Sequence, residues 1–391
     1  MSNSEKSGLL GFYATVIVAL LLHKSVYNKE KKGFGGMNVK DKLIIEDYRK
    51  AKQSFIKLDG IVYDKLCELV KEAGIQTLGI EHRVKREESL AEKLVRNGDW
   101  YQKFDDLTDI LGARVICFFN DEVDKLGKEI EKHFTIDRKN SSDKRALIKA
   151  DSFGYLSLHY TCYLTEKSGY PKDVCNKKFE IQIRTILQHT WAAIEHDIGY
   201  KSEFGLPREY ERGFSRVAGL LEIADDEFIR LRNGMKTYTD DIRTRIKENR
   251  ADEVVINAVS INEFVRHNRP ICELNRKIAE INGAEIKTVD AGNYIEQLAW
   301  FKITELGELQ KLTERRAEAA FKLAENALGA TDIDVLSSNV GLWYLCRAEL
   351  IAEKYTPEKI AEFFSFSIKD KETAKRRSKS FYDKYIGKER I

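Results

Sequence analysis

Residues 179–185 alternate strictly between apolar and polar side chains. The apolar positions are Phe179, Ile181 and Ile183, and the polar positions are Glu180, Gln182 and Arg184. Successive side chains of a strand point to opposite faces, so the pattern predicts a strand with one buried face and one polar face. An acid, an amide and a guanidinium group are therefore expected side by side.

A second segment, residues 155–162, repeats the alternation. Its polar side carries Tyr155, Ser157 and His159, and its apolar side carries Leu156, Leu158, Tyr160 and Cys162. Gly154, immediately before the segment, permits a tight turn or the close approach of a ligand. Two such segments are typical of an antiparallel sheet with one solvated face.

Longer segments follow the helical period of 3.6 residues. Thr185 is a residue type that caps helices, and apolar residues at 187, 191, 194 and 198 then form one stripe. Similar spacing predicts helices within residues 37–79, 121–133 and 207–246. Helices that frame a mixed sheet of about four or five strands make an α+β domain, which we place at residues 37–248.

Two groups of charged residues precede the alternating segments. Arg83, Lys85, Ser89 and Lys93 form a cationic row with one hydroxyl group. A solvated helix face has the same spacing, so this row alone does not indicate a site. Asp109, Gly112 and Arg114 lead into the apolar residues 115–119, which predict a strand with an acid and an arginine at its start.

Five motifs in this order resemble the synthetase domain of the RelA/SpoT family. They are R-x-K-x3-S-x3-K at residues 83–93, D-x2-G-x-R at 109–114, G-Y-x-S-x-H at 154–159, E-x-Q-x-R-T at 180–185 and W-A-x2-E-H at 191–196. The resemblance extends over residues 42–232. It implies a nucleotidyltransferase-like mixed sheet and an alarmone synthetase, which moves pyrophosphate from ATP to the 3′-hydroxyl group of GDP or GTP.

The resemblance also assigns roles to residues. Asp109 and Glu180 would bind Mg2+, and Glu180 would accept the proton of the attacking hydroxyl group. Gln182 and Arg184, the other catalytic residues, would orient Glu180 and the nucleotides, although Gln182 could equally be a structural amide. ATP would contact Arg83, Lys85, Ser89, Lys93 and Arg114. The acceptor nucleotide would contact Gly154, Tyr155, Ser157, His159 and His189, together with Lys149 from the polar segment 140–149. These residue types suit pyrophosphoryl transfer, which needs a cationic cradle, a metal held by carboxylates and a base.

Two positions on the acceptor side depart from the family pattern. Phe153 stands where the family usually has Asn, and His189 stands where small synthetases tend to carry the Asn that reads the guanine edge. An imidazole offers other donors and acceptors than an amide, so the accepted purine stays open. The closest alternative is a toxic synthetase that pyrophosphorylates the 3′ end of tRNA. The segment ahead of residue 42 is too short for the HD domain of long family members, so no hydrolase is expected.

The amino-acid composition excludes few functional classes. The 391 residues carry a net charge of +3 with 33% charged residues, so the overall charge does not call for nucleic acid or an acidic surface. The six cysteines form no C-x2-C pair and lie mostly in apolar segments. They predict reduced thiols without metal or disulfide bonds, and a cytoplasmic catalytic domain.

The first 36 residues differ from the rest of the chain. Residues 8–22 carry no charge, and a basic run follows at 29–32. A signal peptide would have its positive charge ahead of the apolar run. Residues 8–27 are therefore predicted to anchor the chain in a membrane with the catalytic domain in the cytosol. The competing interpretation is that Met37 is the true start.

Residues 249–391 predict an all-helical domain without a catalytic motif of its own, and we expect it to regulate the synthetase. Within it, residues 355–379 resemble a helix-turn-helix, and residues 369–390 carry nine Lys or Arg against four Asp or Glu. Such a face suits a polyanion, so DNA binding and a solvated helix face both remain open. A non-catalytic nucleotide-responsive regulator that binds DNA is the alternative from another functional class. A homo-oligomer is also left open.

Overall fold

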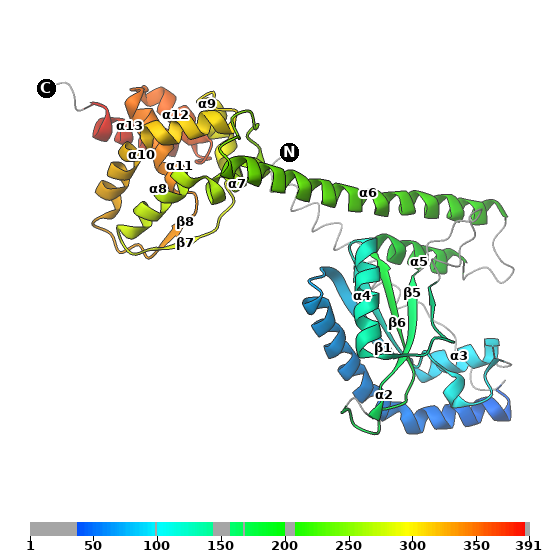
Figure 1. Cartoon of the computed structure of the whole chain (residues 1–391). Coiled ribbons are helices and arrows are strands. Elements are labelled where there is room, and N and C mark those ends of the chain that lie inside the picture. The colour runs from blue at the N-terminus through cyan, green and yellow to red at the C-terminus, as the bar shows by residue number, and fades with distance from the viewer. Residues whose placement is uncertain (1–36, 98–99, 144–156, 167–168, 200–207, 388–391) are drawn as a thin grey trace. The chain divides into compact units, whose positions relative to one another are not determined.

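The computed structural model describes residues 37–97, 100–143, 157–166, 169–199 and 208–387. The chain forms two compact units, Met1–Ile229 and Arg230–Ile391, and each is described by itself (Figure 1). The unit boundary lies within a long helix, α6 (Arg208–Lys247). The sequence placed the domain boundary at the end of this helix, after residue 248.

The first unit is built on a mixed sheet, which has six strands in the described residues. They are β1 (Thr77–Val84), β2 (Leu111–Cys117), β3 (Thr135–Ile136), β4 (Ser142–Asp143), β5 (Leu158–Tyr163) and β6 (Phe179–Thr185). The order is β1-β2-β6-β5-β3, and β4 pairs with β5. The pair β2 and β6 is parallel, and the other pairs are antiparallel. The predicted α+β class is confirmed.

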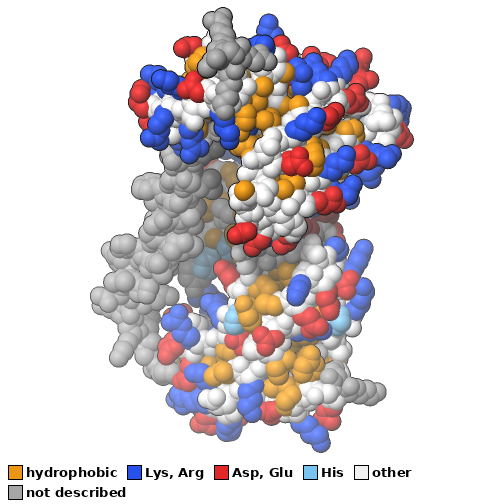
Figure 2. Space-filling view, turned by 90° about the vertical axis from the view of Figure 1, so that its left-hand side faces the viewer, with side chains coloured by type: hydrophobic (Ala, Val, Ile, Leu, Met, Phe, Trp, Pro, Cys, Tyr) orange, Lys and Arg blue, Asp and Glu red, His pale blue; other side chains and the backbone are white. Residues whose placement is uncertain are grey.

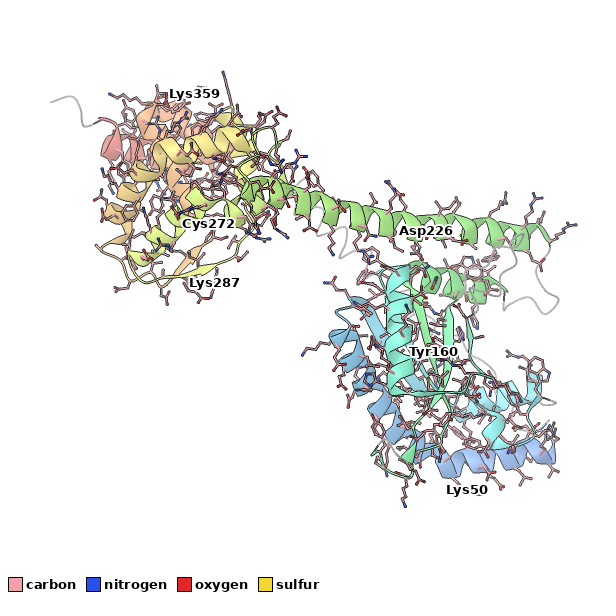
Figure 3. All side chains as sticks on the ribbon, viewed as in Figure 1. Lys50, Tyr160, Asp226, Cys272, Lys287 and Lys359 are labelled. Atoms are coloured by element: carbon pink, nitrogen blue, oxygen red, sulfur yellow. The ribbon has the colours of Figure 1, made fainter. Side chains whose placement is uncertain are left out.

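The apolar face of this sheet is covered by α2 (Val39–Glu72) and α4 (Asn120–His133). Phe179, Ile181 and Ile183 of β6 are fully buried there, as their alternation predicts. Tyr160 of β5 reaches α4, where its hydroxyl group donates to the Glu131 carboxylate at 2.6 Å (Figure 3). α3 (Glu87–Asn97) packs against α2, and α5 (Ile186–Gly199) contacts β2 and β6.

The second unit is helical, with one addition that the sequence did not predict. Its helices are α7 (Ala258–His267), α8 (Arg269–Glu280), α9 (Ile295–Trp300), α10 (Leu306–Leu328), α11 (Val340–Ala352), α12 (Pro357–Ser365) and α13 (Lys371–Tyr385). Two strands of three residues, β7 (Glu285–Lys287) and β8 (Val335–Ser337), form a small parallel sheet. Strands of three residues leave no periodic pattern, so the all-helical prediction needs this correction.

The helix pair α12 and α13 matches its sequence prediction. The Thr356 side chain caps α12, and Asp370 caps α13 by accepting from the Thr373 amide at 2.8 Å. Ile360, Phe363 and Ala374 are buried between the helices and the core, while Arg376 and the neighbouring cations face solvent. The structure of this helix pair does not test DNA binding, which stays a prediction. Figure 2 shows Lys and Arg interspersed with Asp and Glu over the visible surface, in line with the small net charge.

All six cysteines are free thiols. Cys117, Cys162, Cys175 and Cys346 are buried, Cys272 is partly exposed and Cys67 is exposed. Burial raises the pKa of the Cys117 thiol, and likewise that of Cys346, to about 12. The thiols of Cys117 and Cys346 are therefore protonated and unreactive near neutral pH.

Among the described helices, none combines the length and hydropathy of a membrane span. The predicted anchor, residues 8–27, lies outside the described residues, so it stays a prediction.

Candidate active site

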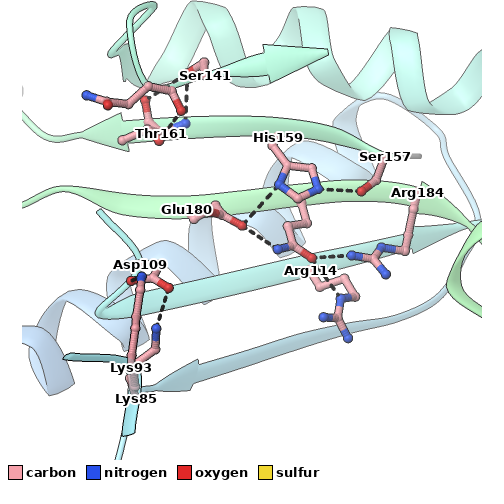
Figure 4. A network of polar contacts seen from close by, with 12 residues as sticks. Lys85, Lys93, Asp109, Arg114, Ser141, Ser157, His159, Thr161, Glu180 and Arg184 are labelled. Atoms are coloured by element: carbon pink, nitrogen blue, oxygen red, sulfur yellow. Dashed lines mark hydrogen bonds and ion pairs between the residues drawn. The ribbon is translucent and has the colours of Figure 1, made fainter. Parts of the chain in front are cut away.

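Strand pairing arranges the polar face of the sheet in rows. One row consists of Glu81, Arg114, Gln182 and His159, and the next of Arg83, Gly112, Glu180 and Thr161. Each row crosses β1, β2, β6 and β5 in that order, which brings together residues that lie far apart in the sequence (Figure 4). Gly112 has no side chain, and a Cβ atom at this position would meet no other atom within 4 Å. The face therefore has an open space between Arg83 and Glu180.

Gln182 connects the acid of this face to two arginines. Its Oε1 atom accepts from Arg114 Nε at 3.3 Å and from the Arg184 guanidinium group, and its Nε2 atom donates to Glu180 Oε1. Because the amide oxygen is needed by the two guanidinium groups, the amide nitrogen must face the carboxylate. Gln182 thus fixes the orientation of Glu180.

Glu180 is held as a carboxylate from a second side. His159 Nδ1 lies 3.3 Å from Glu180 Oε1, and His159 Nε2 lies 2.6 Å from Ser157 Oγ. Burial raises the pKa of the Glu180 carboxyl group, but the hydrogen bonds to His159 and Gln182 outweigh burial, and the pKa falls below its ordinary value of 4.5. Glu180 is therefore ionised at neutral pH and can accept a proton.

Asp109 lies between two lysines. Lys93 Nζ donates to Asp109 Oδ1 at 2.8 Å, and Lys85 Nζ donates to Asp109 Oδ2. Burial raises the pKa of Asp109, yet the positive charge of Lys85 and the hydrogen bonds of both lysines hold it below its ordinary value. Burial lowers the pKa of Lys85, whereas for Lys93 the bond to Asp109 outweighs burial and the pKa is raised.

The predicted cationic row does not lie on one helix. Arg83 is on β1, Lys85 follows the strand, and Ser89 and Lys93 are on α3. The change from strand to helix at residues 85–86 is what brings Lys85 and Lys93 together at Asp109. The alternative of a solvated helix face is therefore wrong for the two lysines, while Arg83 and Ser89 are exposed to solvent.

Thr185 caps α5 as predicted. Its Oγ1 atom accepts from the Gln188 amide at 3.1 Å, and Gln188 Oε1 accepts from the Thr185 amide at 2.9 Å. This reciprocal pair fixes the turn from β6 into α5. It places His189, one turn into the helix, beside Arg184.

Two buried nitrogen atoms at this turn have no hydrogen-bond partner among the described residues: His189 Nδ1 and Arg184 Nε. Burial lowers the pKa of His189, and it lowers the pKa of Arg184 to about 10, with Arg114 contributing to both shifts. The imidazole is therefore neutral near pH 7. Buried polar atoms without a partner could be satisfied by a bound ligand.

Glu81 is a site residue that the sequence analysis missed. Its carboxylate pairs with Arg114 Nη1 at 2.9 Å, and its charge also affects the pKa of His189. The available signal was its position two residues before Arg83, which puts both side chains on the same face of β1. The predicted acceptor residues Lys149, Gly154 and Tyr155 lie outside the described residues, as does Phe153.

The donor types around Asp109 and Glu180 fit Mg2+. No group of three or more His, Cys, Asp or Glu side chains arranged for a metal occurs in the described residues. Mg2+ commonly binds one or two carboxylates and takes its other ligands from substrate phosphates and water. The negative charge of Asp109 affects the pKa of Glu180, so the two carboxylates belong to one electrostatic site.

A family model described as a region found in RelA / SpoT proteins matches residues 82–204. GTP pyrophosphokinase YjbM of Bacillus subtilis (strain 168) is 30% identical over 154 residues, which cover 38% of this chain and 69% of the relative. This chain belongs to the RelA/SpoT family. GTP pyrophosphokinase YwaC of the same organism is 29% identical over 171 residues, which cover 41% of this chain and 76% of that relative.

A solved structure is also similar to part of the chain. It is a GTP pyrophosphokinase family protein from Streptococcus pneumoniae, 26% identical, with a TM-score of 0.41 over 52% of this chain and 97% of that one. The RelA/SpoT region at residues 82–204 contains every residue of the two rows of the polar face except Glu81. The second unit lies beyond it.

Proposed function

We propose that this member of the RelA/SpoT family transfers the pyrophosphoryl group of ATP to the 3′-hydroxyl group of GDP or GTP. Family membership places the chain in the enzyme class of GTP pyrophosphokinases. The observation that carries the proposal is the position of Glu180. This ionised carboxylate is fixed by Gln182 and His159 and lies next to the open space at Gly112.

The proposed step is a direct displacement. The 3′-oxygen of the acceptor attacks the β-phosphorus of ATP, and the bond from that phosphorus to the oxygen bridging to the α-phosphorus breaks. The β- and γ-phosphoryl groups pass to the acceptor, and AMP leaves. The hydroxyl proton goes to the Glu180 carboxylate. A general base must lie within hydrogen-bond distance of the proton that it accepts, so this step depends on the orientation that Gln182 gives to Glu180.

Positive charge on the same face would stabilise the reacting phosphates. Lys85, Lys93 and Arg83 lie around the open space from the side of β1 and α3, and their charges would be complementary to the triphosphate. Asp109 and Glu180 would hold Mg2+, which when bound neutralises charge on the phosphoryl oxygens. Arg114, held by Glu81 and Gln182, would keep a planar guanidinium group for contact with the donor nucleotide.

A second candidate acceptor is the 3′-terminal adenosine of tRNA. The observation that favours it is His189, a neutral imidazole with an unpartnered Nδ1 atom at the position where small synthetases tend to carry Asn. A neutral imidazole can donate with one nitrogen and accept with the other, so it is not restricted to guanine.

The test supplies the full chain with ATP labelled at the γ-phosphate and, in separate reactions, GDP, GTP or tRNA. Label is expected in the guanosine nucleotides, and Glu180→Gln should reduce transfer by at least ~10²-fold because it removes the base. Glu131→Gln is the matched control, since Glu131 also accepts a hydrogen bond but lies on the α4 side of the sheet. Label in tRNA alone would select the second acceptor, and no label in any reaction would refute the proposal.

DNA binding by residues 355–390, membrane association through residues 8–27, a homo-oligomer and the cytoplasmic location remain predictions from the sequence.

A further inference from the structure

Both oxygen atoms of the Asp109 carboxylate are occupied by ammonium groups. Lys93 Nζ lies 2.8 Å from Oδ1, and Lys85 Nζ donates to Oδ2 (Figure 4). The three side chains are largely buried, with 28% of Asp109, 14% of Lys85 and 23% of Lys93 exposed. Ion pairs with so little water are screened far less than pairs on the surface. The carboxylate that is expected to hold a metal ion is therefore already paired on each oxygen.

The charges of this cluster also oppose a free metal ion. One carboxylate and two ammonium groups leave a net charge of +1, and Arg83 on β1 adds another positive charge nearby. A divalent cation that approached Asp109 alone would meet two ammonium groups at close range. A triphosphate would instead be attracted, because it brings the negative charge that the lysines lack.

We propose that Lys85 and Lys93 block Asp109 in the free protein, and that Asp109 becomes able to bind a divalent metal ion only when a triphosphate draws the two ammonium groups away. The inference rests on the proposed function, since it takes ATP as the donor. According to this inference, the metal site is not preformed in the free protein and is completed by the bound nucleotide.

The surroundings allow this exchange without movement of the backbone. The Lys85 backbone is fixed, because its carbonyl accepts from the Tyr48 hydroxyl group at 2.6 Å and its amide donates to the Ile110 carbonyl at 2.7 Å. Lys93 extends from α3, and its Nζ atom lies 5.0 Å from the centre of the Tyr101 ring. Only the ends of two long side chains need to rotate to leave Asp109 and reach phosphate oxygens.

Metal binding itself provides the test, with Mn2+ as a probe detected by electron paramagnetic resonance. The full chain is titrated alone and with the α,β-methylene analogue of ATP, which cannot undergo the reaction. Alone, the wild-type chain is expected to bind Mn2+ at least ~10-fold more weakly than the Lys93→Met variant does, because one oxygen of Asp109 is then released. Lys85→Met should act in the same direction and serves if the first variant is unstable.

Controls separate this site from adventitious binding. Asp109→Asn in the Lys93→Met background should remove the gained site. Lys57→Met deletes another lysine that pairs with an aspartate, Asp173, at 2.8 Å, and it should gain no Mn2+ site. If the free wild-type chain binds Mn2+ through Asp109 as tightly as with the analogue, or if neither lysine variant gains affinity, the proposal is wrong. Because no acceptor is present, this outcome is independent of whether pyrophosphate is transferred.

Discussion

Gln182 is the residue on which the orientation of the candidate site depends most. Its amide group donates to one carboxylate and accepts from two guanidinium groups. No other described side chain forms hydrogen bonds with both Glu180 and Arg184. An apolar replacement would remove both contacts at once, whereas Gln182→Glu keeps the shape of the side chain and replaces the amide donor with a negatively charged oxygen. The acidic variant therefore isolates the electrostatic part of its role.

We expect Gln182→Glu to shift the pH dependence of transfer. In the wild-type chain the pKa of Glu180 is below 4.5, so Glu180 stays ionised as the pH falls toward that value and is protonated only below it. In the variant a hydrogen-bond donor is replaced by a like charge, which raises the pKa of Glu180. The acid side of the pH–rate profile should therefore move to higher pH. At pH 6 the transfer rate of the variant should be at least ~10-fold below that of the wild-type chain.

A matched control for this charge change lies on α10. Gln310 Nε2 donates to Glu314 Oε1 at 3.0 Å, the same kind of contact outside the site, and Gln310→Glu should leave the profile unchanged. If the acid side of the pH–rate profile is the same in Gln182→Glu as in the wild-type chain, Gln182 does not control the ionisation of Glu180.

Much of this site follows from the sequence at the scale of single residues. The alternation over 179–185 placed Glu180, Gln182 and Arg184 on one face, and the structure agrees. The contacts of Asp109 and of Glu81 could not be predicted, because they depend on how α3 and the strands are brought together across separations of 16 to 33 residues. Strand register is set by packing of the whole sheet, which no local pattern encodes.

Glycine has opposite roles in two helices of the second unit. A Cβ atom at Gly341 of α11 would lie 2.6 Å from Asn275 Oδ1 and 2.9 Å from Ile271 Cδ1, so α11 approaches α8 too closely for a side chain. The Gly341 amide donates to Asn275 Oδ1 at 2.7 Å, which holds the contact. At Gly234 of α6, a Cβ atom would meet nothing within 4 Å.

The same substitution should therefore change stability in opposite directions. Gly341→Ala is expected to lower the free energy of unfolding of the second unit by ~1–3 kcal/mol, because the core must move apart. Gly234→Ala is expected to raise it by roughly 0.5–1 kcal/mol, because alanine restricts the unfolded chain and favours a helix. Urea unfolding followed by circular dichroism measures both, and equal effects would contradict the packing argument.

Among the elements, long amphipathic helices were predicted best. The helix expected at 121–133 is Asn120–His133, and the one expected at 207–246 is Arg208–Lys247. The small sheet of β7 and β8 was missed because each strand has only three residues and none of them is buried. Such strands form because the surrounding helices bring them together, and their own sequence gives no periodic signal.

The two units have separate hydrophobic cores. The core of the first is formed by residues between Met37 and Ile183, and the core of the second by residues between Ile242 and Ala374. Every described candidate site residue lies in the first unit. The choice of acceptor should therefore be a property of that unit.

We predict that a chain of residues 37–249 still transfers pyrophosphate to the same acceptor as the full chain. Its rate is expected to differ, because the second unit adds a folded body with no catalytic residues of its own, which we expect to regulate the synthetase. Transfer of labelled pyrophosphate by both chains measures this, with Glu180→Gln in the shortened chain as the blank. A change of acceptor would assign part of the acceptor site to residues 250–391.

The distribution of thiols gives the chain a natural chemical reporter of unfolding. Cys67 on α2 is exposed, so a maleimide dye should attach there first in the native protein. Cys117, Cys162 and Cys175 are buried in the first unit and Cys346 in the second. Peptide mapping of dye incorporation during mild denaturation would therefore show which unit opens first, without any engineered residue.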